Sequence, residues 1–329
     1  MLPQTDKTAM NIFEEIRHKT RLVAEAAQFI TIEYDQLDAY AKALPIENIA
    51  NPPLDETCHY LGHQEATLLY FLTLEAINFG SGYFPHLKNS VEGSGYFTVA
   101  KAWKVYFEQH APVTALALTQ LTTQDCLTIF GQSKDNKAIV TLMGFFAAAL
   151  NQVGHFLLER FKGEVKLMFE SVQHSAEGLV SLLIQIPCFQ DFAPYNHLIV
   201  PILKRPQIAV ADISLAFGNK GLGHFKDLNQ LTIFADNMVP HVLRCDGILT
   251  YDTALANIVD NQKLVIAGSL MEVEIRACAI HTVELIREKF KEMGYDFTSV
   301  DLDYLLWNRG QAAFYETTYP IHLTRTIFY

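Results

Sequence analysis

Asp236 is the residue of this sequence whose type and surroundings most favour chemistry. It lies in residues 230–240, where most of its neighbours are apolar. A carboxylate among apolar residues is unfavourable unless it is paired, caps a helix or acts on a ligand. The structural alternatives are a helix N-cap or a salt bridge to Lys204 or Arg244.

A second unusual segment combines glycines with aromatic rings. Residues 74–85 and 93–97 both alternate Gly with Phe and Tyr. Glycine lets a backbone and its neighbouring rings approach a flat ligand closely. The sequence therefore indicates either a stacking site for a flat ligand or a tight aromatic turn packed on the core.

The familiar motifs for metals and cofactors are missing from the sequence. His59 and His63 have the i, i+4 spacing of two ligands on one helix face, but Gly62 lies between them and no third ligand is obvious. The chain has no Walker A, G-x-S-x-G or H-E-x-x-H motif, and the glycines of residues 218–223 do not match the dinucleotide fingerprint. We expect no cofactor and no metal.

Charge and cysteine usage narrow the class of partner. The 329 residues contain 25 Lys and Arg against 36 Asp and Glu, a net charge of −11. Such a chain repels nucleic acid, so we expect a small-molecule partner instead. The five cysteines are widely spaced without a C-x-x-C pair, which favours reduced thiols in the cytoplasm.

The most apolar run of the chain is residues 138–150, which is shorter than the roughly 20 residues of a membrane span. The first ten residues lack the apolar core of a signal peptide. We therefore expect no membrane association; the sequence gives no indication of oligomeric state.

Helical spacing of apolar residues dominates, and alternating runs are not convincing, so we expect an all-α, predominantly helical fold. Thr122, Asp135 and Ser269 are the expected N-caps, and Ser269 with Glu272 has capping-box spacing. Residues 197–217 are ambiguous because two prolines interrupt them. The expected helices span residues 11–29, 34–43, 64–78, 97–111, 124–130, 135–161, 175–186, 228–245, 269–291 and 300–314.

Prolines and aromatic residues interrupt the helices near residues 187–197 and suggest a soft boundary. We accordingly divide the chain into residues 1–190, which hold the glycine–aromatic segments, and residues 191–329, which hold Asp236. The two regions can also form one compact unit.

Several sequence blocks keep one order from about residue 74 to the last residue, and together they resemble the queuosine salvage family, the queuosine 5′-phosphate N-glycosylase/hydrolases. The blocks are Asn78-Phe79, Gly95-Tyr96-Phe97, LKRPQI at 203–208, LTIFAD at 231–236 with Val239-Pro240, GS at 268–269 with EVEIRA at 272–277, DYLLW at 303–307 and RTIFY at 325–329. The chain departs from the family pattern at residues 80–83, at Asn237-Met238 and at His241, and is interpreted as a bacterial-type member.

The resemblance implies an enzyme that hydrolyses the N-glycosidic bond of queuosine 5′-monophosphate to queuine and ribose 5-phosphate. It also implies a helical architecture similar to helix-hairpin-helix DNA glycosylases. Two alternatives remain: a non-catalytic helical protein that binds a modified nucleoside or base, and a glycosylase of duplex DNA, which the charge of −11 disfavours.

The resemblance also assigns the catalytic residues. Asp236 would stabilise the oxocarbenium-like ribose and orient water or attack C1′ itself, and Lys204 would keep Asp236 ionised and hydrogen-bond the ribose or the departing base. The base is a 7-deazaguanine without N7, so the usual protonation of a purine at N7 is not open to it. The expected substrate-binding residues are Asn78, Phe79, Tyr96, Phe97, Thr232, Asn237, His322, Arg325 and Tyr329, with the three rings stacking on the base, His322 and Arg325 near the phosphate, and Tyr329 closing the site.

Overall fold

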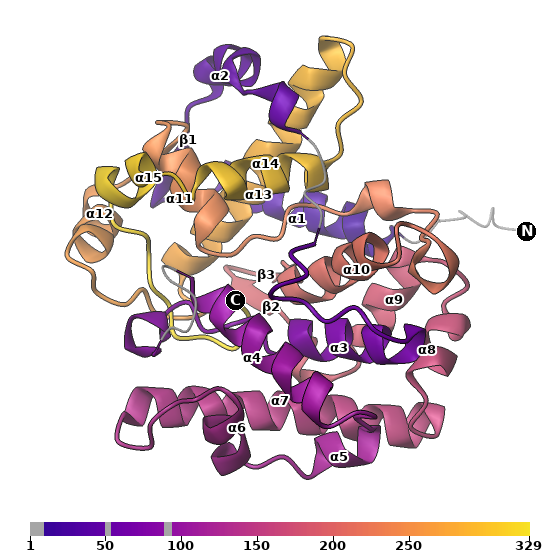
Figure 1. Ribbon diagram of the computed structural model, residues 1–329. Coiled ribbons are helices and arrows are strands. Elements are labelled where there is room, and N and C mark those ends of the chain that lie inside the picture. Colours follow the sequence, from indigo (N-terminus) through magenta and orange to yellow (C-terminus); the bar gives the residue numbers. More distant parts are fainter. Residues whose placement is uncertain (1–9, 50–53, 89–93) are drawn as a thin grey trace, which may run out of the picture.

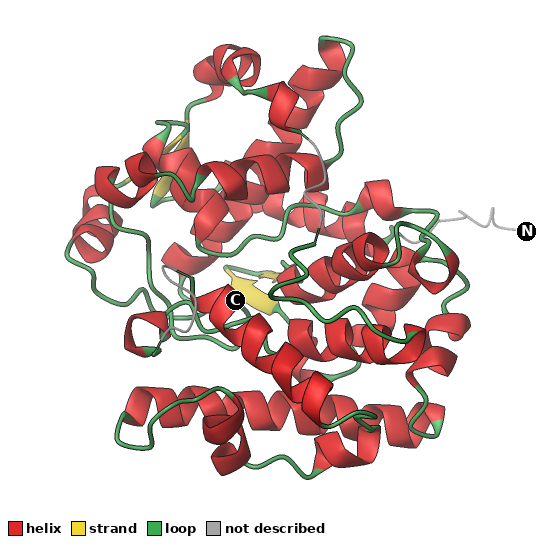
Figure 2. Ribbon diagram, viewed as in Figure 1, coloured by secondary structure: helices red, strands yellow, loops and turns green. Residues whose placement is uncertain are grey.

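The computed structural model describes residues 10–49, 54–88 and 94–329 and is predominantly helical (Figures 1 and 2). Its helices are α1 (Ile12–Glu25), α2 (Leu37–Ala43), α3 (Gln64–Ala76), α4 (Gly95–Gln109), α5 (Ala115–Thr119), α6 (Thr123–Ile129), α7 (Lys137–Phe161), α8 (Val165–Ser171), α9 (Ala176–Leu183), α10 (Lys204–Ala216), α11 (Met238–Cys245), α12 (Thr253–Asp260), α13 (Leu270–Glu292), α14 (Ser299–Arg309) and α15 (Ala313–Thr318). Most of the expected helices are therefore confirmed, with ends shifted by a few residues.

Two small antiparallel sheets occur that alternation in the sequence did not indicate. β1 (Ile30–Ile32) pairs with β4 (Leu249–Tyr251), and β2 (Phe192–Tyr195) pairs with β3 (Leu198–Pro201). Their strands have three or four residues each, too few for a clear period-2 pattern. The ambiguous residues 197–217 thus contain a strand followed by α10.

The helix expected over residues 228–245 is wrong in its first half. Residues 231–237 are not helical, because side chains from other elements bind their backbone: Thr232 N donates to Gln207 Oε1 at 2.9 Å, and Phe234 N donates to Asp303 Oδ1 at 2.8 Å. α11 begins only at Met238, which places Pro240 in its first turn, where a missing N–H breaks no helical bond.

The predicted caps are confirmed in part. Thr122 and Ser269 cap α6 and α13 through their side-chain oxygens. The cap of α7 is Asn136 rather than Asp135: its Oδ1 accepts from Ala138 N at 3.1 Å and Ile139 N at 3.4 Å.

The helices enclose one continuous apolar core that extends from Phe13 to Tyr315. α7 packs against α5 and α6 on one side of the molecule, and α13 packs against α1 on the other, with α3 and α10 between them (Figure 1). Among the described residues, α7 is the one helix long and apolar enough to cross a membrane, and half of that stretch is buried in the protein. Its packing as a core helix accounts for its apolar composition.

The predicted division at residue 190 stays a prediction, although α1 and α13 come from opposite sides of it and pack together.

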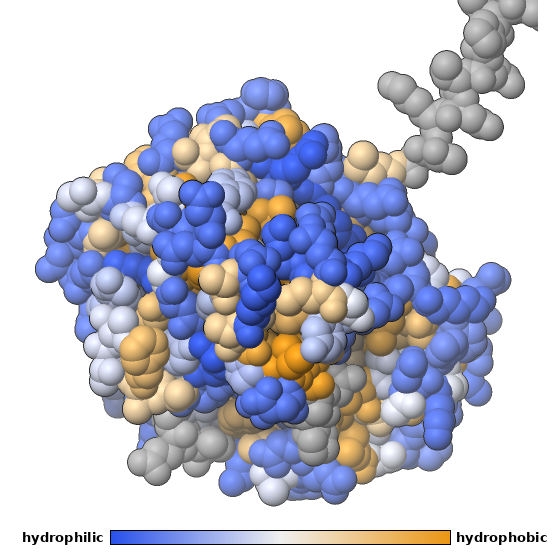
Figure 3. Space-filling view, turned by 90° about the horizontal axis from the view of Figure 1, so that it is seen from above, coloured by the Kyte–Doolittle hydropathy of each residue, from blue (hydrophilic) through white to orange (hydrophobic). Residues whose placement is uncertain are grey.

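The face shown in Figure 3 is mainly polar, with apolar residues gathered near its centre.

The carboxyl-terminal tail returns to the glycine-rich turn after α3. Gly80 has φ of +117° and its N–H donates to the carbonyl of Tyr329 at 3.0 Å. A side chain at Gly82 would collide with the backbone of Thr324, so this glycine is required for the close approach of the tail. The glycine–aromatic segment therefore receives the last residue of the chain, and Gly93 of its second part lies outside the described residues.

Candidate active site

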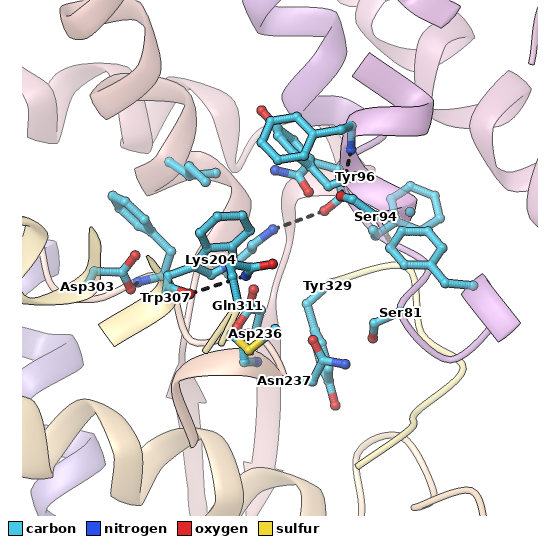
Figure 4. A pocket seen from close by; sticks show the side chains of 18 of the residues that line it. Ser81, Ser94, Tyr96, Lys204, Asp236, Asn237, Asp303, Trp307, Gln311 and Tyr329 are labelled. Atoms are coloured by element: carbon cyan, nitrogen blue, oxygen red, sulfur yellow. Dashed lines mark hydrogen bonds between the residues drawn. The ribbon is translucent and has the colours of Figure 1, made fainter. Parts of the chain in front are cut away.

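A cavity of about 520 Å³ lies between the turn after α3, the start of α4, α10, the segment before α11, α14 and the tail. Figure 4 shows that Lys204, Asp236 and Asp303 are directed to one space, with Tyr96, Trp307 and Tyr329 around it. The elements that form it come from both halves of the sequence.

Asp236 lines this cavity and accepts from the first turn of α11, whose N-cap residue is Asn237. Its Oδ1 accepts from Met238 N at 2.7 Å and from Val239 N at 3.4 Å, which places the carboxylate at the positive end of α11. Burial raises the pKa of Asp236, while Lys204 and the two N–H groups act in the opposite direction. The N-cap alternative considered from the sequence is wrong for Asp236, because Asn237 is the N-cap, although Asp236 still binds two N–H groups of that helix.

Lys204 is the first residue of α10 and is 4% exposed. Its Nζ donates to the carbonyl of Asn78 at 3.2 Å. Burial lowers the pKa of Lys204, and the charges of Asp236 and Glu75 oppose that effect. Lys204 and Asp236 both line the cavity, and the charge of each acts on the pKa of the other.

A buried ion pair connects the backbone beside both residues. Asp191 accepts from Arg276 Nη1 at 3.0 Å and Nη2 at 2.6 Å, and also from Lys204 N at 3.2 Å. Arg276 Nε donates to the carbonyl of Ala235 at 2.8 Å. The pair thereby fixes the backbone at Lys204 and the residue before Asp236 with one set of bonds.

The predicted stacking residues Phe79, Tyr96 and Phe97 all line the cavity. The Arg205 guanidinium lies 4.8 Å from the centre of the Phe79 ring and donates to the carbonyls of Ala76 and Cys188. The Tyr96 hydroxyl lies 2.9 Å from Nε2 of His59. These contacts hold the rings in defined orientations at the cavity wall.

Asn78, Asn237 and Tyr329 also line the cavity. The Tyr329 ring lies 4.4 Å from the guanidinium carbon of Arg276, and its hydroxyl is 3.3 Å from Nε2 of His322. The last residue of the chain is therefore held in the wall of the cavity.

Three predicted binding residues lie outside the cavity lining. Thr232 is fully buried and bonds to Gln207, and His322, whose pKa burial lowers to about 3, lies behind Tyr329. Arg325 is exposed and stacks on Tyr83. The structure thus brings neither predicted phosphate ligand to the cavity wall.

Sequence reasoning missed several residues of the lining, among them Asp212, Asp303 and Trp307. Asp212 is two helical turns after Lys204 on α10, so the i, i+8 spacing could have placed it on the same face. Asp303 and Trp307 lie in one of the recognised blocks. Burial and then the charge of Asp236 raise the pKa of Asp303 to about 8, while its Oδ1 accepts from Phe234 N.

In the part of the chain that the structure describes, no group of three or more His, Cys, Asp or Glu could hold a metal ion. His59 bonds through Nδ1 to the carbonyl of Asp55 at 3.0 Å, and His63 is exposed at the start of α3.

The fold and the cavity define a helical protein with a carboxylate and an ammonium group in one enclosed site. The sequence matches the family described as Queuosine salvage protein over residues 58–329, and the chain belongs to that family. A queuosine 5′-phosphate N-glycosylase/hydrolase of Sphaerobacter thermophilus is 36% identical over 315 residues, covering 94% of this chain and 96% of the relative. Relatives with the same name from Mus musculus and Dictyostelium discoideum are 28% identical over 335 residues (95% and 98% covered) and 38% identical over 181 residues (55% and 56% covered).

Proposed function

We propose that this protein hydrolyses the N-glycosidic bond of queuosine 5′-monophosphate and releases queuine and ribose 5-phosphate. The observation that carries this proposal is the placement of Asp236 and Lys204 at one cavity of about 520 Å³, a size suited to a small ligand. Relatives named queuosine 5′-phosphate N-glycosylase/hydrolase, similar over nearly the whole chain, support the choice of substrate.

Asp236 acts on the ribose side of the bond. Breaking the bond between C1′ and the base nitrogen develops positive charge on the ribose ring, and a fixed carboxylate stabilises that charge. Both helix amides bond to Oδ1, which leaves Oδ2 to face C1′ or to orient the attacking water. The N-terminus of α11 favours the ionised form of the group.

Lys204 supports the ionised form of Asp236, because its charge acts to lower the pKa of that carboxyl. Its ammonium can also donate to the ribose or to the departing base, since only the Asn78 carbonyl accepts from it among the described residues.

Asp303 can assist the leaving group. Its pKa of about 8 keeps this carboxyl protonated at neutral pH, and it lies in the same cavity as Asp236. A neutral carboxylic acid donates a proton where a 7-deazaguanine, which has no N7, must accept one at another atom.

The test is release of queuine from queuosine 5′-monophosphate by the wild type and by Asp236→Asn. Asn caps a helix as well as Asp, so the variant keeps the start of α11. We expect its kcat to fall by about 10²–10⁴-fold, while queuine still raises the melting temperature of both proteins. A wild type that binds queuine but never releases it from the nucleotide would instead be a non-catalytic binding protein.

We also propose the finer features that the resemblance implies: a helix-hairpin-helix DNA glycosylase-like arrangement, a bacterial-type member of the family and a location in the cytoplasm. The helical content and the five free cysteines support these proposals. Superposition of an experimental structure on such a glycosylase tests the first of them. Fractionation of the source cells, followed by immunoblotting, tests the last.

A further inference from the structure

The lining of the cavity is rich in carboxyl groups. Asp55, Asp212, Asp236 and Asp303 face a single ammonium, that of Lys204, and no arginine belongs to the described lining. A cavity wall of this composition attracts a positively charged group of a ligand. Asp236 and Asp303 have roles in the proposed reaction. Asp55 is exposed and bonds to Thr57. Asp212 is therefore the carboxyl group of this set that has no role so far.

Asp212 is backed by a second carboxyl, Glu75 of α3. Glu75 is fully buried and Asp212 is 6% exposed. Asn78 Nδ2 donates to Glu75 Oε2 at 2.7 Å, and the Tyr304 hydroxyl donates to Asp212 Oδ1 at 3.4 Å. Burial and then the adjacent Glu75 charge raise the pKa of Asp212 well above its usual range. Because two adjacent buried carboxyl groups resist carrying two negative charges at once, the pair favours holding a proton at the cavity wall.

The side chains next to this pair present hydrogen-bond acceptors. Because the nitrogen of the Asn78 amide is bound to Glu75, its oxygen is the group left to accept. His59 Nδ1 must donate to the Asp55 carbonyl, and burial lowers the pKa of His59, so its Nε2 accepts from the Tyr96 hydroxyl. The oxygen of Tyr96 then has only lone pairs to offer a ligand.

We propose that Asp212, with Glu75 behind it, binds a positively charged amine carried by the base of the substrate. The inference rests on the proposed function, because queuine bears a secondary amine on its 7-aminomethyl arm. This amine is protonated near neutral pH and donates two N–H bonds. The carboxyl pair supplies the opposite charge, and Asn78 and Tyr96 supply further acceptors.

Binding of the amine also moves a proton. The ammonium favours the doubly ionised carboxyl pair, so a proton carried by the pair leaves to solvent while the amine keeps its own. The groups that face Asp212 are Glu75 and Tyr70 from α3, Tyr96 from α4, Lys204 from α10 and Tyr304 from α14. Lys204 is the one cation among them and opposes the incoming charge, whereas Glu75 attracts it.

The test is titration calorimetry of the full chain with two probes: queuine and an isosteric analogue with an ether oxygen in place of the amine nitrogen. We expect the wild type to bind queuine about 10- to 100-fold more tightly, with a proton released at pH 7 that is visible as a dependence on buffer ionisation enthalpy. Affinities within two-fold of each other would overturn the proposal without any variant.

Asp212→Asn should abolish the preference and the proton release, and Glu75→Gln should weaken both. Asp55→Asn, which removes an exposed carboxyl of the same lining, should keep both. An Asp212→Asn protein that melts normally and still prefers queuine contradicts the assignment. Release of queuine from the nucleotide is assayed in parallel. A protein that turns the nucleotide over but shows no preference for the amine overturns this inference alone. A protein that neither binds queuine nor releases it overturns the proposed function as well.

Discussion

At the scale of single residues, Asp236 uses its two oxygens differently. The N–H groups of Met238 and Val239 hold Oδ1, and Oδ2 is left for a ligand. A carboxylate fixed in this way cannot rotate away from the cavity without losing its two bonds to the first turn of α11. Its orientation is therefore established before any substrate binds, which is the condition under which a fixed charge stabilises a transition state best.

Lys204→Met removes the ammonium while keeping a long apolar side chain in a buried position. Because the charge of Lys204 acts to lower the pKa of Asp236, that pKa rises in the variant. We expect kcat to fall by about 10²-fold and the acidic limb of the rate profile to move to higher pH. Steady-state rates of queuine release between pH 4 and 9 measure both effects. An unchanged acidic limb would show that Lys204 does not control the ionisation of Asp236.

Asp303→Asn tests the neutral carboxyl. The folded-state pKa of Asp303, about 8, lies above the unfolded value near 4, so its contribution to stability is complete below about pH 4 and is lost as pH rises toward 8. The variant should therefore lose less melting temperature than the wild type between pH 5 and 8, and its rate should no longer fall through pH 8. Asn keeps an oxygen that can accept from Phe234 N. Equal pH dependence of melting in both proteins would contradict the assigned ionisation.

At the scale of elements, the start of α10 and the segment before α11 are connected through α13. Arg276 of α13 donates to the Ala235 carbonyl and binds Asp191, which in turn accepts from the N–H of Lys204. The two candidate catalytic residues are 32 positions apart in the sequence, so local structure alone cannot set their separation. The ion pair supplies that constraint.

Arg276→Lys keeps the charge but cannot make the bidentate bond to Asp191 and the bond to Ala235 together. We expect the free energy of unfolding to fall by about 1–3 kcal/mol, because buried groups lose hydrogen bonds while the charge remains, and kcat to fall more than KM rises. Urea unfolding and steady-state kinetics measure the two. As a control, Arg287→Lys alters a partly exposed ion pair of the same helix and should change neither by much. A stability loss with unchanged kcat would show that the pair serves folding only.

At the scale of the whole molecule, elements that depend on local patterns could be predicted from the sequence, whereas elements that depend on contacts between distant residues could not. Apolar spacing predicted α3, α6 and α13 well, because a helical period is visible within a few turns. The non-helical run through Thr232 was missed, because its backbone is bound by Gln207 and Asp303 from other elements.

The same difference applies to the site. Asp236 stood out by its apolar neighbours, and the resemblance added Lys204. Asp212 looks like an ordinary polar position of α10 until Glu75 of α3 is brought behind it. The resemblance placed Tyr329 at the cavity, but His322 supports it from behind instead of facing a ligand.

The net charge of the whole molecule determines whether it can bind its substrate as a free nucleotide or as part of an RNA chain. A net charge of −11 repels an RNA chain, and the described lining of the 520 Å³ cavity holds one ammonium, that of Lys204. We therefore expect the protein to release queuine from the free 5′-mononucleotide and not from intact queuosine-containing tRNA. Chromatographic assay of queuine before and after digestion of that tRNA to 5′-mononucleotides measures this. Digestion should raise the yield from background to near completion, since the cavity then receives a small ligand instead of a polyanion; equal release from intact tRNA at 50 mM salt would show that the acidic surface does not exclude it.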